Sequence, residues 1–263
     1  MSTPARQTLS IAIVAKNEEA NLRRILPTIA PWADEIVLVD SGSSDETVAV
    51  AESFGARVLH QEWLGFGPQK NFAIDQCTSE WVLSLDADEE PSSELVALLP
   101  EVITKSSPDL AGFTLARRNY FLGRPMRHGG MYPDRKLRLF RRGQAHFQHR
   151  SVHESMLANG PVAKLAGDLH HHSYPTLTLY IEHMNRYSSA SIPLLLGRGK
   201  RSLSFPAFVW NIVANPLATF AYNYILRGGF LDGREGLLLH LYHSVYVSWK
   251  YVKAWEQAHD GAI

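Results

Sequence analysis

Short apolar runs alternate with helical patterns through the first third of the chain, and this alternation limits the fold more than any other feature. Strands are expected at residues 9–15, 35–39, 56–60 and 81–86, and helices at 18–30, 43–54 and 68–77. Strand–helix units with short connections form a largely parallel sheet that helices cover on both faces. We therefore expect an α/β, Rossmann-like fold whose binding crevice opens at the carboxyl ends of the strands.

The fourth apolar run ends at two carboxylates. The stretch WVLSLDADEEP places Asp86 at the end of the strand and Asp88 two residues later. Side chains at positions i and i+2 of a strand project to the same side, so both carboxylates would face one ion. Hard oxygen ligands favour Mg²⁺ or Mn²⁺, and Mg²⁺ usually keeps positions open for water and substrate phosphates. The alternative is an acidic turn that caps the strand.

More polar residues are expected at the same rim of the sheet. Lys16, Asn17 and Glu18 follow the first strand, Asp40 follows the second, and Lys70 lies on the third helix. Asp40 could accept hydrogen bonds from a base or ribose, and Lys16 or Lys70 could meet phosphate charge. Equally, Asp40 could only begin the turn at residues 41–43, and the lysines could be solvated. A nucleotide lying across this rim would use these side chains together.

Four separated motifs occur in the order known from one enzyme family. The runs IVAKNEEANL, EIVLVDSGSSDET, GPQKNFAI and WVLSLDADEE together resemble the nucleotide-binding half of glycosyltransferase family 2. The resemblance implies a GT-A fold, an inverting reaction, a divalent cation and a nucleotide-sugar donor. Many members carry two aspartates after the second strand, whereas here Ser41 follows Asp40.

A second set of motifs is similar to the bacterial lipopolysaccharide-core β-glucosyltransferases. It consists of YPDRKLRLFRR, VHE, the run HHHSYPTLTLYIEHMNRYSSAS and RGGFLDGREGL. This resemblance implies UDP-glucose as the donor and an inner-core heptose as the acceptor. It also places Glu154 where the family has its catalytic base, and it favours His171 as a ligand of the Asp88 metal or a contact to the diphosphate.

Inversion needs a carboxylate that removes the proton of the acceptor hydroxyl as its oxygen attacks the anomeric carbon. Glu154 in SVHESM is the candidate, and its alternative role is a surface ion pair with Arg150. His171 lies in a run of three histidines, which cannot all reach one ion from a regular strand because neighbouring side chains point to opposite faces. A packed or solvated histidine is the alternative there.

The middle of the chain should complete the site. Strands are expected at 111–121 and 135–140, joined by a loop rich in glycine and proline that either shapes an acceptor pocket or only connects them. Arg135 and Arg138 belong to a basic cluster that suits phosphate on a donor or acceptor. Interleaved aromatic residues do not accompany the cluster, so we do not expect nucleic-acid binding.

The C-terminal third predicts helices that lie in a membrane interface. Residues 202–226 contain no charged residue. Every fourth residue from Asn211 to Asn223 is Asn or Thr, so a helix here would carry a polar stripe, and Pro216 would kink it. Basic residues flank it, and Trp210 and Tyr222 would lie at headgroup level. A further helix at 234–257 is expected to pack in a core or to form an oligomer contact.

The cysteine content and the N-terminal sequence indicate the compartment, and the order of the expected elements indicates the domains. The single Cys77 excludes an internal disulfide, and the N-terminal residues have no long apolar core of a secretory signal, so we expect a cytoplasmic protein at the inner face of the membrane. We predict a catalytic domain at 1–175, divided into a nucleotide-sugar half (1–105) and an acceptor half (106–175), and a helical region at 176–263.

The function expected from these features is metal-dependent, inverting transfer of a hexose from a nucleotide sugar to a lipid-linked saccharide. A transferase that charges a polyprenyl phosphate is the nearest alternative. From other classes, a nucleotidyltransferase that uses the same acidic pair, or a nucleotide-sugar-binding protein without catalysis, would also fit.

Overall fold

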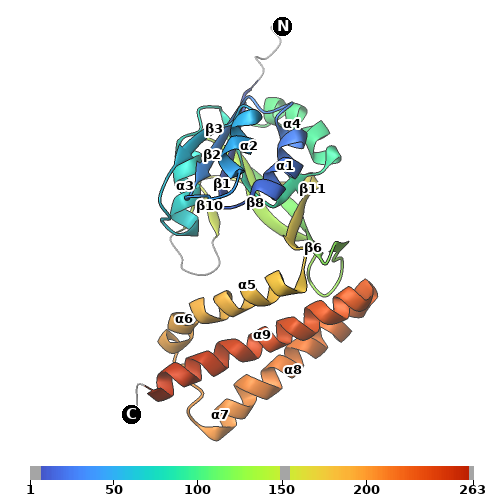
Figure 1. Ribbon diagram of the computed structural model, residues 1–263. Helices are drawn as coiled ribbons and strands as arrows, with labels where there is room; N and C mark the ends of the chain where they lie inside the picture. The colour runs from blue at the N-terminus through green and yellow to red at the C-terminus, as the bar shows by residue number, and fades with distance from the viewer. Residues whose placement is uncertain (1–6, 149–154, 261–263) are drawn as a thin grey trace. The chain divides into compact units, whose positions relative to one another are not determined.

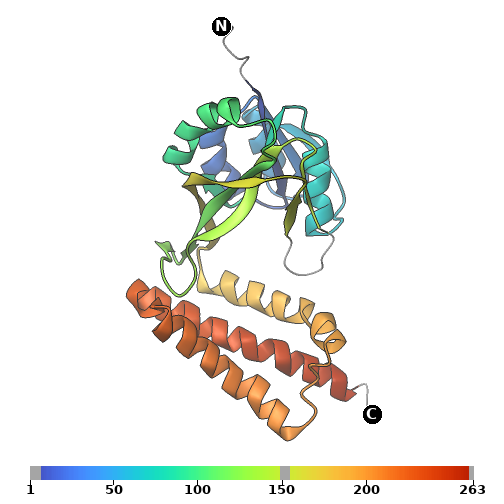
Figure 2. The same ribbon diagram turned by 180° about the vertical axis from the view of Figure 1, so that it is seen from behind.

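A computed structural model describes residues 7–148 and 155–260, and the chain divides into two compact units. Unit 1 comprises Met1–Arg117 and Arg135–His171, and unit 2 comprises Arg118–Asp134 and His172–Ile263. Figures 1 and 2 show both units from opposite sides. The domain boundary at residue 175 stays a prediction.

Strands and helices alternate through the first part of unit 1 as the sequence predicted (Figure 1). In chain order the elements are β1 (Leu9–Ala15), α1 (Glu19–Ile29), β2 (Glu35–Asp40), α2 (Thr47–Ser53), β3 (Arg57–His60), α3 (Phe66–Asp75), β4 (Trp81–Asp86), β5 (Glu89–Pro91), α4 (Ser93–Lys105), β6 (Gly112–Phe121), β8 (Asp134–Arg141), β9 (Ala145–Phe147), β10 (Met156–Ala158) and β11 (Val162–Tyr174). The strands β6 and β11 continue from unit 1 into unit 2.

The main sheet is mixed, with a parallel part and an antiparallel extension. Its strand order is β3-β2-β1-β4-β8-β6-β11-β5. The strands β3, β2, β1 and β4 are parallel, whereas β8 runs antiparallel to β4 and β5 antiparallel to β11. The expected α/β fold is therefore confirmed. Because the chain leaves β1 toward β2 on one side and reaches β4 on the other, the carboxyl ends of these strands form a topological switch point.

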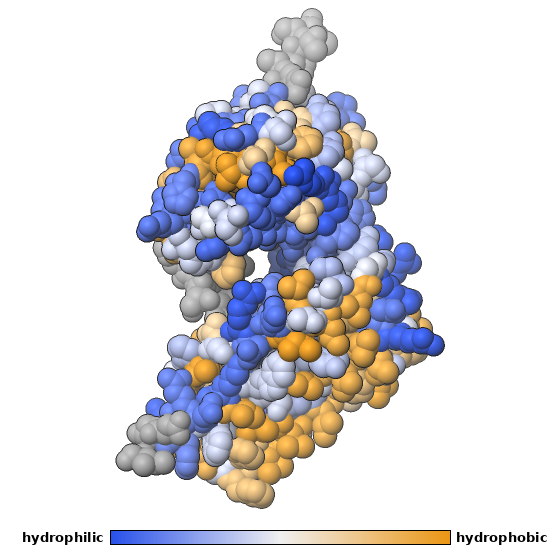
Figure 3. Space-filling view, viewed as in Figure 1, coloured by the Kyte–Doolittle hydropathy of each residue, from blue (hydrophilic) through white to orange (hydrophobic). Residues whose placement is uncertain are grey.

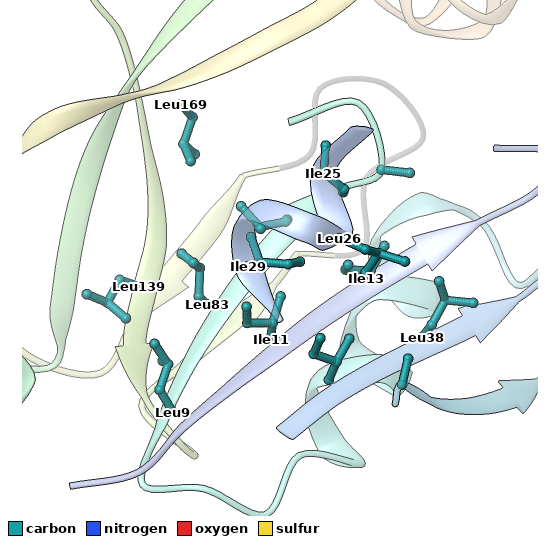
Figure 4. Packing of buried hydrophobic residues seen from close by; sticks show 14 of the residues in the cluster. Leu9, Ile11, Ile13, Ile25, Leu26, Ile29, Leu38, Leu83, Leu139 and Leu169 are labelled. Atoms are coloured by element: carbon teal, nitrogen blue, oxygen red, sulfur yellow. The ribbon is translucent and has the colours of Figure 1, made fainter. Parts of the chain in front are cut away.

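Side chains of β1 enter two separate cores, one on each face of the sheet. Ile11 and Ile13 pack with Ile25 and Leu26 of α1, as Figure 4 shows, and all four are fully buried. Ala12, between them, joins the cluster on the opposite face. Burying one such aliphatic side chain contributes about 1.5–3 kcal/mol, so a continuous apolar run is what a strand covered on both faces requires.

In its described residues, unit 2 is helical apart from a short strand and the ends of β6, β8 and β11. Its elements are β7 (Arg124–Pro125), α5 (Leu177–Ala190), α6 (Ile192–Gly197), α7 (Phe205–Val209), the π-helical segments η1 (Trp210–Ala214) and η2 (Ala221–Leu226) with α8 (Asn215–Phe220) between them, the 3₁₀ turn η3 (Gly229–Asp232) and α9 (Gly233–Asp260). The long helix α9 contacts both α5 and α8, and both views show it between them (Figures 1 and 2). Tyr180, Met184 and Leu239 are among the buried residues of its core.

The helical run from α7 to η2 turns apolar side chains outward. Phe205 is 79% exposed, Trp210 63%, Leu217 64% and Leu226 77%. The polar side chains that recur every fourth position from Asn211, the polar stripe, lie on the other side, since Asn211 donates to Ser202 and is only partly exposed. Figure 3 shows hydrophobic surface spread over the helices of this unit. We name this outward row the apolar face; it comprises Phe205, Val209, Trp210, Val213, Leu217, Tyr222, Ile225 and Leu226.

The apolar face passes through two π-helical segments. Phe205, Val209, Val213 and Leu217 recur every fourth residue, with Trp210 next to Val209, and the following step, to Tyr222, takes five residues. A π turn closes its hydrogen bonds over five residues, and Tyr222, where the longer step ends, lies in η2. Among the described residues, no helix has both the length and the apolarity that crossing a bilayer would require.

Candidate active site

The sheet brings the predicted acidic residues to one edge. In the parallel register Asp40 lies opposite Ala15, and Asp86 lies opposite Val14, so both carboxylates follow the carboxyl ends of neighbouring strands. This is the edge at which open α/β sheets bind ligands. The residues Lys16, Asn17 and Glu18 leave β1 at the same edge.

Asp86 is held between two cations. Lys70 of α3 places its Nζ 2.6 Å from Oδ1, and Arg138 of β8 places Nη2 2.5 Å from Oδ2. Burial by itself would raise the pKa of Asp86, but the charges of Arg138 and Lys70 outweigh it and hold the pKa well below its usual range. The carboxylate is therefore ionised across the physiological range, and two of the predicted donor-binding residues, Lys70 and Arg138, lie against it.

Glu89 is a buried carboxylate that the sequence analysis did not single out. Its side chain is fully buried, and it accepts from Arg138 at 2.6 Å and from the backbone N–H of Asp86 at 3.1 Å. Arg117 of β6 lies 3.5 Å from the same carboxylate. Glu89 thus ties β5, β6 and β8 to the end of β4. The only sequence feature that could have pointed to Glu89 is its position in DADEE. Acidic residues after a strand are ordinarily solvated, so this pattern does not predict a buried carboxylate.

Asp88 lies in a turn and not on an extension of β4, which corrects the expected i, i+2 geometry. The chain reverses after Asp86 and forms β5, whose residue Glu89 pairs with His171 of β11. That pairing brings His171 Nε2 to 3.3 Å from Asp88 Oδ2. Burial would raise the pKa of Asp88, but the neighbouring His171 lowers it below its usual value.

The loops after β1 and β2 are tied to each other. Asn17 adopts a left-handed backbone conformation, with a φ of 56°, and its side chain accepts from the Ser44 N–H. The Glu18 N–H donates to Thr47 at the start of α2. Burial raises the pKa of Glu18, and a hydrogen bond from Asn21 offsets only part of that rise. These bonds give the crevice a rigid wall on the β1 side.

Asp40 organises the turn that follows it. Its carboxylate accepts from the backbone N–H groups of Gly42 and Ser43 and from the Ser43 hydroxyl. Burial would raise its pKa, but the bonds from Ser43 and Gly42 lower it. This is the turn-forming role that the sequence left open beside a contact to the nucleotide, and the residue is only 5% exposed. A base or ribose contact of Asp40 stays a prediction.

Other predicted site residues lie apart from this cluster or outside the described chain. Lys16 is exposed at the edge. Arg135 is also exposed, and its guanidinium lies 3.4 Å from the carbonyls of Thr114 and Leu165. Glu154, the predicted base, lies outside the described residues.

Comparison with known families decides what kind of protein carries this site. The model described as "Glycosyl transferase family 2" matches residues 10–160, a range that holds every candidate residue named above apart from His171. The chain belongs to glycosyl transferase family 2. It is therefore a glycosyltransferase, and the resemblance read from the four sequence motifs is confirmed.

Curated relatives of this family 2 enzyme match over most of their length. The lipopolysaccharide core biosynthesis glycosyltransferase LpsC of Rhizobium meliloti (strain 1021) is 32% identical over 245 residues, which cover 90% of this chain and 88% of the relative. The uncharacterized glycosyltransferase RT0209 of Rickettsia typhi is 28% identical, with 88% and 80% of the two chains covered. The likeness therefore extends beyond the range of the family match into unit 2.

A solved structure shares the fold of this family 2 enzyme. The mannosyltransferase PcManGT from Pyrobaculum calidifontis, solved in complex with GDP-Man and Mn²⁺, aligns with a TM-score of 0.56 over 97% of this chain and 89% of its own. The sequences are 16% identical, so the comparison concerns the fold. The fold is GT-A-like.

Proposed function

We propose that this family 2 glycosyltransferase transfers a hexose, with inversion, from a nucleotide diphosphate donor to a lipid-linked saccharide. Glucose from UDP-glucose and the inner core of lipopolysaccharide are the donor and acceptor that we propose. The observation that carries the proposal is the likeness to LpsC, a lipopolysaccharide core glycosyltransferase, across nine-tenths of this chain. The cluster of acids and cations at the switch point supports a donor whose leaving group is a diphosphate.

The residues at the crevice fit a divalent cation in part. Adjacent ligands of an octahedral ion at about 2.1 Å lie about 3 Å apart, and Asp88 Oδ2 and His171 Nε2 are separated by 3.3 Å. Both oxygens of Asp86 already meet cations, and among the described residues no three His, Cys, Asp or Glu side chains gather as a metal site. Asp88 and His171 would hold Mg²⁺ or Mn²⁺, with Asp86 joining only if Lys70 moves aside. The ion would stabilise negative charge on the departing diphosphate.

The chain's own residues divide the remaining work. Lys70 and Arg138 hold their charges beside the crevice, where the carboxylates of Asp86 and Glu89 balance them until a divalent cation and the diphosphate bind together. Asn17 and Glu18 fix the loop that would bound the donor. We assign the proton transfer to Glu154, which would take the proton of the acceptor hydroxyl as that oxygen attacks.

We propose a peripheral position at the cytoplasmic face of the inner membrane. Support comes from the apolar face, whose exposed rings and aliphatic chains match the side of an interfacial helix that faces lipid. The stretch 198–231 around it carries Arg198, Lys200, Arg201 and Arg227 and no acidic residue, so its charge complements anionic headgroups.

Vesicle flotation tests this position. Replacing Phe205 and Leu226 together by Gln should reduce binding to vesicles that contain anionic lipid. Leu157→Gln is the matched control, because Leu157 is an apolar residue of unit 1 that is 43% exposed. Equal binding of the double variant and the wild type would exclude the apolar face as the membrane contact.

Product analysis tests the transfer reaction. Incubation with UDP-glucose and detergent-dispersed, core-truncated lipooligosaccharide should release UDP and yield a β-linked product by NMR. Released pyrophosphate would indicate nucleotidyl transfer, and a product formed only on a polyprenyl phosphate would identify the other acceptor class. Donor binding without turnover under all conditions would contradict the proposal.

Variants test the two acidic roles separately. Glu154→Gln should keep the thermal shift produced by UDP-glucose and lose at least about 100-fold in turnover, since general-base catalysis contributes about 10²–10⁴-fold. Asp88→Asn should lose the additional thermal shift that Mn²⁺ produces with UDP-glucose. Asp109→Asn, at an exposed position of the same unit, is the control for charge removal. Ordinary turnover of Glu154→Gln would overturn the assignment of the base.

A further inference from the structure

Unit 2 contains a pocket lined by its own residues. Its volume is about 260 Å³, and its walls come from two loops that are more than 100 residues apart in the chain. Arg124, Pro125, Arg127 and His128 line it from the loop around β7, and Leu231 and Asp232 line it from η3. Two arginines, a histidine and an exposed leucine thus converge on one hollow.

Asp232 locks the two loops together. One oxygen of its carboxylate accepts from the backbone N–H groups of Arg127 and His128, at 3.0 and 2.9 Å. The other lies 2.8 Å from His128 Nδ1. Because Asp232 is only 2% exposed and meets three nitrogens, its charge is largely used in holding the loop and offers little repulsion to an anion in the pocket.

Glycines let the basic side chains lie close to the backbone. A Cβ at Gly233 would come within 2.9 Å of the Arg124 guanidinium, and a Cβ at Gly130 within 2.1 Å of that of Arg227. Both glycines have a positive φ, so the backbone course and the close approach each disfavour a larger residue. Because these glycines have no side chain, the guanidinium groups of Arg124 and Arg227 can lie directly against the backbone of the two loops.

The side chains that line the pocket include two guanidinium groups and one carboxylate. Arg124 lies 3.2 Å from Glu235, a half-exposed pair that leaves other guanidinium N–H groups for a ligand. Arg127 is exposed, and within the described part of the chain it forms no ion pair. The Asp232 carboxylate accepts from the loop backbone and meets His128, so the Arg127 guanidinium keeps its N–H donors for a phosphate group.

The apolar wall of the pocket distinguishes a lipid headgroup from free phosphate. Leu231 is 57% exposed, and the adjacent Phe230, 50% exposed, packs its ring against Tyr224 of η2. The pocket residue Leu231 thus follows a ring that contacts η2, the segment that carries Tyr222, Ile225 and Leu226 of the apolar face. We propose that it binds the phosphate of an anionic lipid headgroup, with Arg124 and Arg127 on the phosphate and Leu231 against the first carbons of the chains. This site is separate from sugar transfer and does not require it.

Calorimetric titration with a soluble lipid tests the proposal without a donor sugar. Dihexanoyl phosphatidic acid, kept below its micelle concentration, should bind the full chain with one site and at least about tenfold tighter than inorganic phosphate. Arg127→Gln should weaken both ligands about tenfold, because it removes a charge-assisted contact. Leu231→Ser should weaken the lipid alone. Both side chains are exposed, so neither change should affect folding, which circular dichroism checks.

Arg186→Gln is the matched control. It removes the same charge from an exposed position on α5 of the same unit and should leave both affinities unchanged. The proposal is overturned if the lipid does not bind, if inorganic phosphate binds as tightly as the lipid, or if Arg186→Gln weakens binding as much as Arg127→Gln. The thermal shift with UDP-glucose should be the same in all three variants, so failure here and failure of the transferase proposal remain distinguishable.

Discussion

Replacing Arg138 by methionine should destabilise unit 1 strongly, and the reason lies in two carboxylates. Arg138 is 4% exposed, and its Nη2 lies 2.5 Å from Asp86 and 2.6 Å from Glu89. Methionine fills a similar space but leaves Glu89, which is fully buried, without its nearest cation. Removing one partner of a buried ion pair costs about 3–5 kcal/mol because a buried charge loses its compensation, and Arg117, 3.5 Å from Glu89, would replace Arg138 only in part. We expect a loss of this size in the free energy of unfolding.

A second variant separates lost charge pairing from lost packing. In Arg138→Met with Glu89→Gln the buried position carries no charge, and Asp86 keeps Lys70 at 2.6 Å. Replacing a whole buried pair by neutral groups is often close to neutral, so the double variant should regain most of the stability that the single variant loses. The coupling between the two positions should therefore be large and favour the double variant.

Urea unfolding followed by tryptophan fluorescence measures both effects. Trp81, one of six tryptophans, lies at the start of β4 and is fully buried, so the loss of its environment contributes to the change in emission on unfolding. Arg135→Met is the matched control, since it removes an exposed arginine from the same strand, and it should change the free energy of unfolding by about 0.5 kcal/mol at most. The reasoning is refuted if Arg138→Met stays within about 1 kcal/mol of the wild type, or if the double variant is no more stable than the single one.

Three further outcomes are expected. Burial would raise the pKa of Glu35, but hydrogen bonds from Ser10, Thr78 and Arg57 outweigh it and lower the pKa from 4.5 to about 2. The contribution of Glu35 to stability, about 3 kcal/mol, is therefore present above pH 4.5 and is lost as the pH falls toward 2. Urea titrations of the wild type and Glu35→Gln at several pH values would measure it. Gly167→Ala should lower the free energy of unfolding by about 2 kcal/mol or more in the same assay, because φ is +84° and the new Cβ would lie 2.7 Å from Leu95. Gly143→Ala is the control: its φ is +79° but the space around it is open, so the loss should be smaller. Burial raises the pKa of the Cys77 thiol to about 12. In the native protein this thiol should therefore react with a thiol reagent only as fast as the protein unfolds. Rapid labelling of Cys77 without denaturant would contradict this expectation.

The sequence predicted the parallel part of the sheet because that part obeys local rules. Each strand is a continuous apolar run, and each helix has an amphipathic pattern or a recognisable end. The expected helix at 18–30 and the observed α1 (Glu19–Ile29) differ by one residue at each end. Asp40 and Asp86 end their strands as expected, because parallel strands in register carry their carboxyl ends to one edge.

The acidic site could be predicted only in part because its geometry depends on pairing between distant segments. β5 has three residues, too few for a periodic signal, and its partner β11 follows about 80 residues later. That pairing places His171 beside Asp88. The sequence placed Arg138 in a basic cluster on an expected strand, but whether its side chain meets solvent or buried carboxylates is decided by Glu89 on β5. No local pattern contains this information.

The C-terminal helices show a similar limit. The sequence revealed a polar stripe and an apolar side, but which of them faces outward depends on α9, whose Ser248 donates to the Ile212 carbonyl. An ordinary amphipathic helix turns its polar side to water. Here the polar side meets the bundle and the apolar face is exposed, which is the arrangement expected of a surface that an apolar medium covers.

The charges around β4 bear on how a metal and a donor would enter. Asp86 and Glu89 meet three cations, Lys70, Arg117 and Arg138, and Asp88 adds a third carboxylate, so these acids and bases balance. A divalent cation alone would add two positive charges to a balanced cluster, and a nucleotide diphosphate alone would add negative charge beside three carboxylates. Together their charges nearly cancel, and each would lower the electrostatic cost of the other. Because such coupling is reciprocal, we expect Mn²⁺ to bind more tightly with UDP-glucose present and UDP-glucose to bind more tightly with Mn²⁺ present, by the same factor.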